Sequence, residues 1–333
     1  MQVKLIAEIG QAHNGSLQKA HDYIEAIATT GVDAIKFQTH IAAAESSIYE
    51  PFRVKFTDEY ATRFDYWKAM EFTLKEWQGL KAHCDDVGLE FMSSPFSNAA
   101  VDLLEAVGVT CYKIGSGEVN NFLLLEKIAQ TGKPVILSSG MSSYQELDET
   151  VAFLKSKQVR FAILQCTTAY PTQPEAYGLN VIQALKTRYN VPVGFSDHSA
   201  KIETSIAAVA LGADILEFHA VFSKDDFGPD VSSSLTIEAI KVLTQSVRTI
   251  EKAQNNPVNK SDNTKFTELK SIFEKSLSIN KDLKAGHMIQ FEDLEAKKPA
   301  NKGIRASKFK AVIGKALVRD MKQWDFLTQE DIT

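Results

Sequence analysis

Short apolar runs alternate with helix-like segments along residues 1–254. The runs are largely apolar, which is typical of strands buried on both faces of a parallel sheet. The candidates are Val3–Ile9, Ala34–Gln38, Leu89–Ser94, Cys111–Ile114, Pro134–Ser138, Phe161–Cys166, Val191–Ser196 and Ile215–Ala220. Between them, Ser16 and Thr73 are suitable helix N-caps, and Gly31 and Gly88 are suitable helix stops. Eight β/α units in about 220 residues predict an α/β fold, a (β/α)8 TIM barrel.

An open, doubly wound sheet is the alternative arrangement of the same units. It is disfavoured because no Gly-rich dinucleotide loop follows the first strand-like run. One connection, His40–Phe72, is too long for a plain link and carries several aromatic residues, among them Tyr49, Tyr60 and Trp67. Loops of this length are commonly lids or binding loops. A small helical excursion packed on the barrel is an equally good interpretation.

The end of the chain differs in pattern from the barrel. The barrel is expected to finish with a helix near Ile237–Gln254, and the polar stretch 255–264 is expected to be a linker. In the remaining segment, 265–333, the sequence of 282–294 resembles that of 320–332. We therefore expect a barrel domain at 1–254 and a small, pseudo-symmetric, β-rich module at 265–333.

Composition narrows the function classes. The net charge of −5 over 333 residues disfavours a general nucleic-acid-binding surface. No run of 18 apolar residues and no signal peptide are present, so no contact with a membrane is expected. The three cysteines, Cys84, Cys111 and Cys166, are interpreted as reduced thiols of a cytoplasmic protein.

Two histidines, His198 and His219, lie at or just past the ends of two successive strand-like runs. In a parallel barrel these ends are neighbours, so both imidazoles would face one pocket and could share a metal ion. Asp230 follows a turn on the next loop and can reach the same mouth. The alternative is that each histidine is a hydrogen-bonded structural residue.

Two lysines, Lys36 and Lys113, lie inside strand-like runs. A buried lysine is costly unless an anion pairs with it. Ser and Thr hydroxyls near the strand ends suggest that the anion is a bound phosphate or carboxylate. The alternative is internal ion pairing of the two lysines with Glu8 and Glu118. From the residues alone we expect a metal-assisted barrel enzyme that acts on a small anionic substrate, such as a phosphate ester.

Eight motifs in order resemble the sialic acid synthase family. They are AEIGQAHNG (7–15), IKFQT (35–39), SSPF (93–96), YKIGSGEVNN (112–121), LSSGM (137–141), QCTTAYPT (165–172), FSDHS (195–199) and FGPD (227–230). The segment 265–333 resembles the C-terminal antifreeze-like (SAF) domain of that family. The resemblance therefore covers nearly the whole chain.

The resemblance implies a metal-dependent condensation of phosphoenolpyruvate with an open-chain N-acylated aldose, which gives a nine-carbon 2-keto sugar acid and phosphate. The acceptor would be N-acetylmannosamine or a related 2,4-diacetamido hexose. It also implies that His198 and His219 hold Mn²⁺ or Mg²⁺ and that Glu8 is the acid–base candidate. The implied phosphoenolpyruvate contacts are Lys36, Ser94, Lys113, Ser116, Ser138 and Ser196. The implied sugar contacts are Gln38, Glu118, Tyr170 and Asp230.

The resemblance further implies an intertwined, domain-swapped homodimer, in which the C-terminal module gives an arginine to the sugar's N-acyl group in the partner's barrel. Here Lys298 stands at the expected arginine, and Arg305 is a nearby substitute. Lysine cannot reproduce the planar bidentate fork of arginine. Thr168 is a second departure, because sialic acid synthases often have Asn there. These departures leave the acceptor sugar open, with legionaminic-type acids among the options.

Two competing interpretations stay open. One is a related enzyme that condenses phosphoenolpyruvate with a phosphorylated aldose; such enzymes lack the C-terminal module, so 265–333 disfavours it. The other is a catalytically inactive carbohydrate- or ice-binding protein. An inactive protein has no reason to keep the polar strand-end residues Lys36, Lys113 and His219, which disfavours this interpretation as well.

Overall fold

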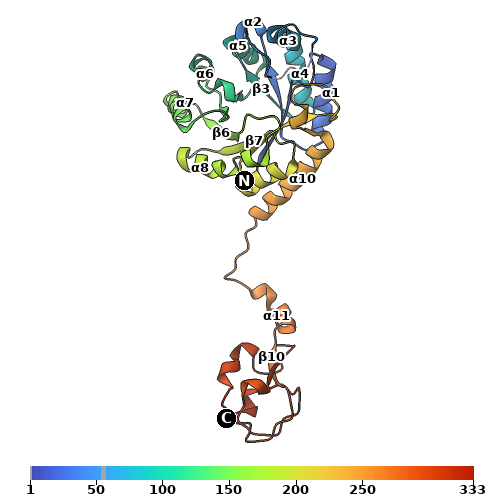
Figure 1. The fold of residues 1–333 in the computed structure, drawn as a ribbon, viewed down its shortest axis with the longest axis vertical. Helices are drawn as coiled ribbons and strands as arrows, with labels where there is room; N and C mark the ends of the chain where they lie inside the picture. The colour runs from blue at the N-terminus through green and yellow to red at the C-terminus, as the bar shows by residue number, and fades with distance from the viewer. Residues whose placement is uncertain (1, 54–57) are drawn as a thin grey trace. The chain divides into compact units, whose positions relative to one another are not determined.

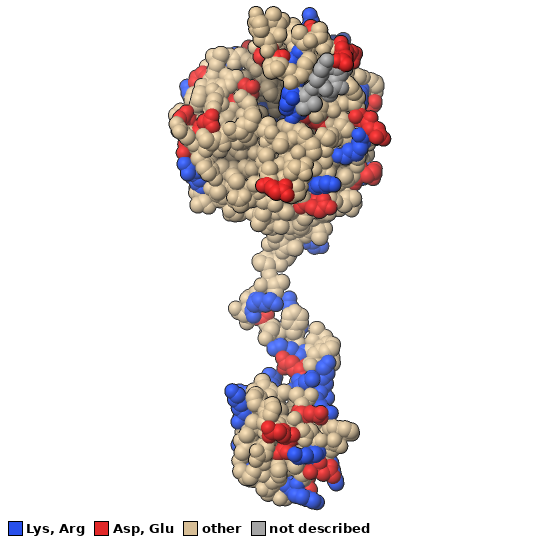
Figure 2. All heavy atoms as spheres, viewed as in Figure 1, with Lys and Arg blue, Asp and Glu red and all other residues tan. Residues whose placement is uncertain are grey.

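The computed structural model describes residues 2–53 and 58–333. The chain forms two compact units, residues 1–256 and residues 257–333 (Figure 1). Their boundary falls inside the stretch 255–264, where the sequence turns polar. Charged side chains of both signs are interspersed over the face of each unit that Figure 2 shows. No helix in the described part of the chain is long and apolar enough to cross a membrane.

The first unit is a closed barrel of parallel strands in sequence order. The strands are β1 (Lys4–Gly10), β2 (Ala34–Thr39), β3 (Glu90–Pro95), β4 (Tyr112–Ile114), β5 (Val135–Ser138), β6 (Phe161–Cys166), β7 (Val193–Asp197) and β8 (Ile215–Val221). Strand β1 pairs with β8, and Glu8 lies opposite His219 in this pairing. The pairing closes the sheet, so the TIM-barrel prediction is confirmed and the open sheet is excluded. A short strand, β9 (Ser234–Thr236), continues beyond β8.

Helices cover the outside of the barrel (Figure 1). They are α1 (Leu17–Ala28), α4 (Leu74–Asp86), α5 (Asn98–Val107), α6 (Phe122–Ala129), α7 (Tyr144–Ser156), α8 (Leu179–Tyr189), α9 (Ile202–Ala210) and α10 (Ile237–Gln254). Their starts follow local capping chemistry. The Ser16 hydroxyl accepts from the Lys19 amide, and Thr73 forms a capping box with Glu76. The predicted N-caps at Ser16 and Thr73 are therefore confirmed.

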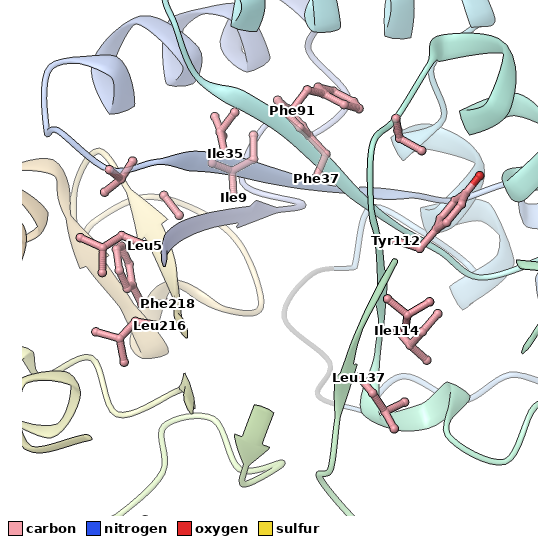
Figure 3. Close-up of a cluster of buried hydrophobic side chains, with 14 of the residues drawn as sticks. Leu5, Ile9, Ile35, Phe37, Phe91, Tyr112, Ile114, Leu137, Leu216 and Phe218 are labelled. Atoms are coloured by element: carbon pink, nitrogen blue, oxygen red, sulfur yellow. The ribbon is translucent and has the colours of Figure 1, made fainter. Parts of the chain in front are cut away.

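Alternation along the strands separates two apolar layers. Leu5, Ile35, Phe37 and Phe218 belong to the large core between the strands and the helices (Figure 3). The residues of opposite parity form a second, smaller cluster that fills the barrel interior. Its members are Ile6, Ala34, Met92, Cys111, Ile136, Ala162, Leu164 and Ile215. This interior layer forms an apolar base, above which the next inward-facing positions of the strands carry the polar site.

The long connection between β2 and α4 contains two helices, α2 (Ala42–Glu45) and α3 (Arg63–Met70). Tyr66, Trp67 and Met70 of α3 pack with Ala42 in a small apolar cluster of their own. The described residues of the connection therefore form the small helical excursion. Several of them also line the cavity described below, as a binding loop would, so the two interpretations do not exclude each other. Residues 54–57 of this connection lie outside the described residues.

The second unit contains α11 (Thr267–Phe273) and an antiparallel pair, β10 (Ser276–Ile279) with β11 (Leu294–Lys297). The repeated aspartates make reciprocal contacts. Asp282 accepts from the Gln323 amide at 2.9 Å and pairs with Lys322, and Asp320 accepts from the Ala285 amide at 3.0 Å and pairs with Lys284. Each repeat thus holds the equivalent turn of the other, which confirms the predicted pseudo-symmetry.

Candidate active site

A cavity of about 370 Å³ opens at the carboxyl ends of the barrel strands. It gathers every barrel residue singled out from the sequence. These are Glu8, Lys36, Gln38, Ser94, Lys113, Ser116, Glu118, Ser138, Tyr170, Ser196, His198, His219 and Asp230. The two other candidates, Lys298 and Arg305, belong to the second unit, where both are exposed.

The strands deliver the floor of this cavity by simple alternation. Lys36 lies two residues after Ala34, Glu8 two after Ile6, and Lys113 two after Cys111. In each case the earlier residue belongs to the apolar layer inside the barrel. Because side chains two apart on a strand share a face, the later one faces the interior one step nearer the mouth. The polar floor therefore rests directly on an apolar base.

Two lysines and two carboxylates form a closed network on this floor. Lys36 pairs with Glu8, and its ammonium donates to the Ser94 hydroxyl at 3.2 Å. Lys113 lies 3.3 Å from a Glu217 oxygen and donates to Ser138. Lys36 and Lys113 are each only 3% exposed. Each buried cation therefore has a buried anion and a hydroxyl as partners, as burial of charge requires.

The predicted internal ion pairs are thus half right. Glu8 is a lysine partner, but Glu118 is not, because its carboxylate accepts from the Asn121 amide group at 2.7 Å. Glu217 takes that place instead, and the Ser196 hydroxyl donates to it at 3.0 Å. Glu217 is a polar residue near the end of the eighth strand-like run, but no role in the site was assigned to it from the sequence. The available signal was its position two residues before His219, which puts both side chains on the same face of β8.

The two floor carboxylates differ in proton affinity. Burial raises the pKa of Glu8, with the neighbouring Glu217 acting in the same direction, although Lys36 opposes it. Burial acts to raise the pKa of Glu217 too, but Lys113 and Lys36 outweigh it and lower that pKa to about 2. Two carboxylates whose environments separate their pKa values can divide acid and base roles. Glu217 stays ionised, and Glu8 is the carboxyl group that can carry a proton.

The histidine pair fits a divalent cation with two nitrogen ligands. The His198 and His219 ring centroids are 5.3 Å apart. His198 Nδ1 lies 2.9 Å from the Thr167 carbonyl oxygen and donates to it, which leaves Nε2 as the nitrogen that could bind a metal ion. Burial acts to lower the pKa of His198, but the neighbouring Cys166 and the Thr167 carbonyl outweigh it and raise that pKa, so a metal ion would compete with a proton for this ring. Burial lowers the pKa of His219 to about 4, so that imidazole is neutral at pH 7. Among the described residues no group of three or more His, Cys, Asp or Glu side chains could hold a metal ion, so substrate or water would complete the coordination.

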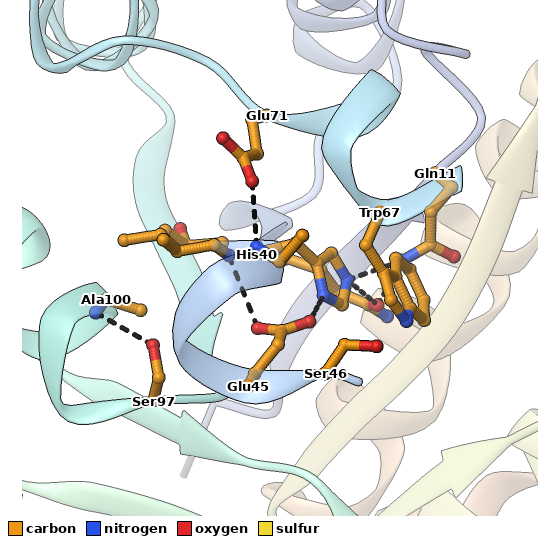
Figure 4. Close-up of polar contacts among 12 residues, drawn as sticks. Gln11, His40, Glu45, Ser46, Trp67, Glu71, Ser97 and Ala100 are labelled. Carbon is orange, nitrogen blue, oxygen red and sulfur yellow. Dashed lines mark hydrogen bonds and ion pairs between the residues drawn. The ribbon is translucent and has the colours of Figure 1, made fainter. Parts of the chain in front are cut away.

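The wall of the cavity near the long connection is built around His40. Its ring stacks on Trp67 at a centroid distance of 3.8 Å (Figure 4). It also stacks on Phe96, at 4.5 Å. His40 Nδ1 bonds Glu45 at 2.5 Å, and Nε2 lies 3.0 Å from the Gln11 amide nitrogen. This packing and bonding fix the orientation of the ring and of its carboxylate partner.

Side chains that sequence reasoning missed supply this wall and part of the mouth. Besides Glu217 they are Gln11, His40, Glu45, Glu50, Arg53, Arg63 and Trp67. Most come from the connection between β2 and α4, whose path depends on tertiary packing. The only available signal for these residues was the unusual length of that connection. Thr168 also lines the cavity, and its buried hydroxyl has no hydrogen-bond partner among the described residues.

Known proteins resemble both units of the chain. Residues 23–259 match the NeuB family and residues 274–333 match the SAF domain. The N,N'-diacetyllegionaminic acid synthase of Campylobacter jejuni is 34% identical over 98% of each chain. The human N-acetylneuraminate-9-phosphate synthase is 36% identical over 76% of this chain and 71% of its own.

A solved structure agrees with these matches. The N-acetylneuraminic acid (sialic acid) synthetase of Leptospira borgpetersenii superposes with a TM-score of 0.71 at 30% identity. The match covers 81% of this chain and 90% of that one. The expected resemblance to sialic acid synthases is thereby confirmed, and the chain belongs to the NeuB family.

Proposed function

We propose that this protein condenses phosphoenolpyruvate with an open-chain N-acylated aldose to form a nine-carbon 2-keto sugar acid and phosphate. The observation that carries the proposal is the pair of buried lysines beside serine hydroxyls, in one cavity with the two imidazoles at the barrel mouth. Phosphoenolpyruvate bears a phosphate and a carboxylate, so it offers an anion to each lysine. The relatives named as synthases of such acids support the same assignment.

In the proposed reaction, carbon 3 of phosphoenolpyruvate attacks the aldehyde carbon and forms the new C–C bond. The aldehyde oxygen takes up a proton, water adds to carbon 2, and phosphate leaves as the C–O bond breaks. Lys36 and Lys113 would bind and orient the anionic groups, with Ser94 and Ser138 as further donors. Glu8 is positioned to exchange the proton, since burial raises its pKa.

The cofactor in this proposal is a divalent ion, Mn²⁺ or Mg²⁺, held by His198 and His219. When bound there it would supply a Lewis acid that polarises the aldehyde oxygen. Gln38, Glu118, Tyr170 and Asp230 would contact the sugar. The Gln38 side-chain amide donates to Glu8 at 2.9 Å, so this proposed sugar contact is hydrogen-bonded to the proposed acid–base group.

A domain-swapped homodimer and a cytoplasmic location complete the proposal. Lys298 or Arg305 from the C-terminal module of a second copy would then replace the arginine that approaches the N-acyl group. The protonated ammonium or guanidinium can each donate to a carbonyl oxygen, but only the guanidinium can do so through two parallel bonds.

Phosphate release from phosphoenolpyruvate tests the proposal. N-acetylmannosamine, 2,4-diacetamido-2,4,6-trideoxyhexoses and arabinose 5-phosphate would each be supplied with Mn²⁺ and with EDTA. We expect phosphate release that requires one N-acylated acceptor and stops when EDTA removes the metal ion. A parallel reaction with Mg²⁺ in place of Mn²⁺ compares the two ions. Release with arabinose 5-phosphate but with no N-acylated sugar would favour the aldose-phosphate enzyme instead. A protein that neither binds nor consumes phosphoenolpyruvate would contradict the proposal.

A further inference from the structure

We infer that the acceptor end of the cavity selects an uncharged sugar over a sugar phosphate, and that Glu50 and Asp230 set this selectivity. The inference rests on the proposed function and deepens it. It concerns six charged side chains that line the cavity from the loops and short helices, which we call the rim: Glu45, Glu50, Arg53, Arg63, Glu118 and Asp230.

Both cations of the rim already have carboxylate partners. Arg53 Nη2 bonds Asp230 at 2.9 Å, and the guanidinium lies 4.0 Å above the Tyr170 ring. Arg63 Nε lies 3.6 Å from Glu50, with its guanidinium 4.4 Å from the Trp67 ring centroid. These ring contacts orient the guanidinium groups towards their partners. A phosphate entering the rim would have to compete with Asp230 and Glu50 for these two cations.

The remaining rim charges are negative and have no Lys or Arg partner among the described residues. Glu45 is bonded by His40 and by the Ile41 amide, and Glu118 by the Asn121 side chain. Burial raises the pKa of Glu118, and the nearby Glu45 acts in the same direction, although Asn121 opposes it. Within the part of the chain that the structure describes, the rim therefore holds four carboxylates against two guanidinium groups.

The floor cannot compensate for this surplus, and the one cation that Lys298 or Arg305 of a second copy adds in the proposed function would still leave the acceptor end negative. Its lysines, Lys36 and Lys113, are paired with Glu8 and Glu217, and in the proposed reaction they are needed by phosphoenolpyruvate. A phosphate monoester carries close to two negative charges at pH 7, so a phosphorylated acceptor would be repelled by the rim. Sugar hydroxyls and N-acyl groups instead supply donors to the carboxylates and acceptors to the spare N–H groups of arginine.

The test compares one neutral acceptor with its own phosphate ester. We would measure kcat/KM at saturating phosphoenolpyruvate for N-acetylmannosamine and N-acetylmannosamine 6-phosphate. Calorimetric binding of both sugars to the phosphoenolpyruvate-loaded protein gives the same comparison without turnover. We expect a preference for the neutral sugar of about 100-fold or more, which weakens as salt screens the rim. A preference for the 6-phosphate by either measurement would overturn the inference.

Two variants with opposite charge effects assign the selectivity to the rim. Glu50→Gln keeps an acceptor for the Trp67 indole, which donates to Glu50 at 3.0 Å, but removes the charge that neutralises Arg63. We expect it to improve use of the 6-phosphate relative to the neutral sugar by about tenfold. Arg63→Gln should shift the same ratio the other way. Equal shifts in one direction, or no shift in either variant, would overturn the assignment.

A matched control removes the same charge far from the cavity. Glu238→Gln is the control, because Glu238 lies on the exposed surface of α10, where it pairs with Lys241. It should leave unchanged the ratio of kcat/KM for the two acceptors.

This inference and the proposed function fail in different ways. Faster reaction with the 6-phosphate overturns the inference alone, whereas absence of phosphoenolpyruvate binding overturns the proposed function as well.

Discussion

Replacing Lys113 with methionine is expected to abolish phosphoenolpyruvate turnover and to destabilise the barrel. Lys113 lies 3.3 Å from Glu217 and donates to Ser138 at 2.7 Å, and all three side chains are buried at the floor of the cavity. Without it, Glu217 keeps the Ser196 hydroxyl, at 3.0 Å, and a more distant cation, Lys36, at 3.9 Å. Breaking a buried pair in this way costs about 3–5 kcal/mol. Loss of a preorganised cation for the substrate should lower kcat/KM by about 10³-fold or more.

A double variant separates binding from folding. Lys113→Met with Glu217→Gln also removes the stranded carboxylate, so most of the lost free energy of unfolding should return while turnover stays absent. Thermal unfolding and calorimetric binding of phosphoenolpyruvate measure the two effects. Lys157→Met is the control, because Lys157 forms an exposed pair with Glu126 worth at most about 1 kcal/mol. Recovered turnover in the double variant would show that Lys113 acts only through stability.

Replacing His219 with alanine is expected to remove both metal binding and metal-dependent turnover. Among the described residues, the histidines that line the cavity are His40, His198 and His219. The rings of His198 and His219 lie side by side, whereas His40 is bonded to Glu45. One imidazole alone holds a divalent ion poorly, so Mn²⁺ bound per chain, measured by electron paramagnetic resonance, should fall sharply. Turnover should fall by about 10³-fold, because the Lewis acid is worth several kcal/mol.

Phosphoenolpyruvate binding provides the contrast for this variant. Its proposed contacts are lysines and serines, so binding should persist in His219→Ala when measured by calorimetry. His83→Ala is the control, because His83 lies on α4 and bonds Glu25 outside the cavity. Wild-type Mn²⁺ binding in His219→Ala would contradict the assignment of the metal ligands.

The barrel was predictable because its signals are local. Strand burial, helix caps and the two-residue alternation all operate within a few positions of the chain. Lys36 and Lys113 were identified on that basis, since a lysine inside an apolar strand needs an anion. The resemblance of residues 282–294 to residues 320–332 likewise predicted a pseudo-symmetric module. The sequence did not show that each repeat accepts a hydrogen bond from the other, because those contacts depend on how the two repeats pack.

Partners across the barrel were not predictable from spacing. The alternative considered for the lysines paired one of them with Glu118, but Glu217 is the partner, because register between strands decides which carboxylate faces which ammonium. Arg53 and Arg63 come to the cavity from the connection that contains α2 and α3, whereas His40 directly follows β2. Their roles follow from contacts between segments far apart in sequence, which local periodicity does not encode.

Phosphoenolpyruvate labelled with ¹⁸O at the bridging oxygen tests the central claim most directly. The labelled compound would be incubated with the protein, Mn²⁺ and the preferred acceptor, and both products weighed by mass spectrometry. Condensation with C–O cleavage predicts that the label leaves entirely with phosphate, and that the sugar product is heavier than the acceptor by an unlabelled pyruvate unit. Label retained in the carbon product, or phosphate released without any acceptor-derived acid, would contradict the account.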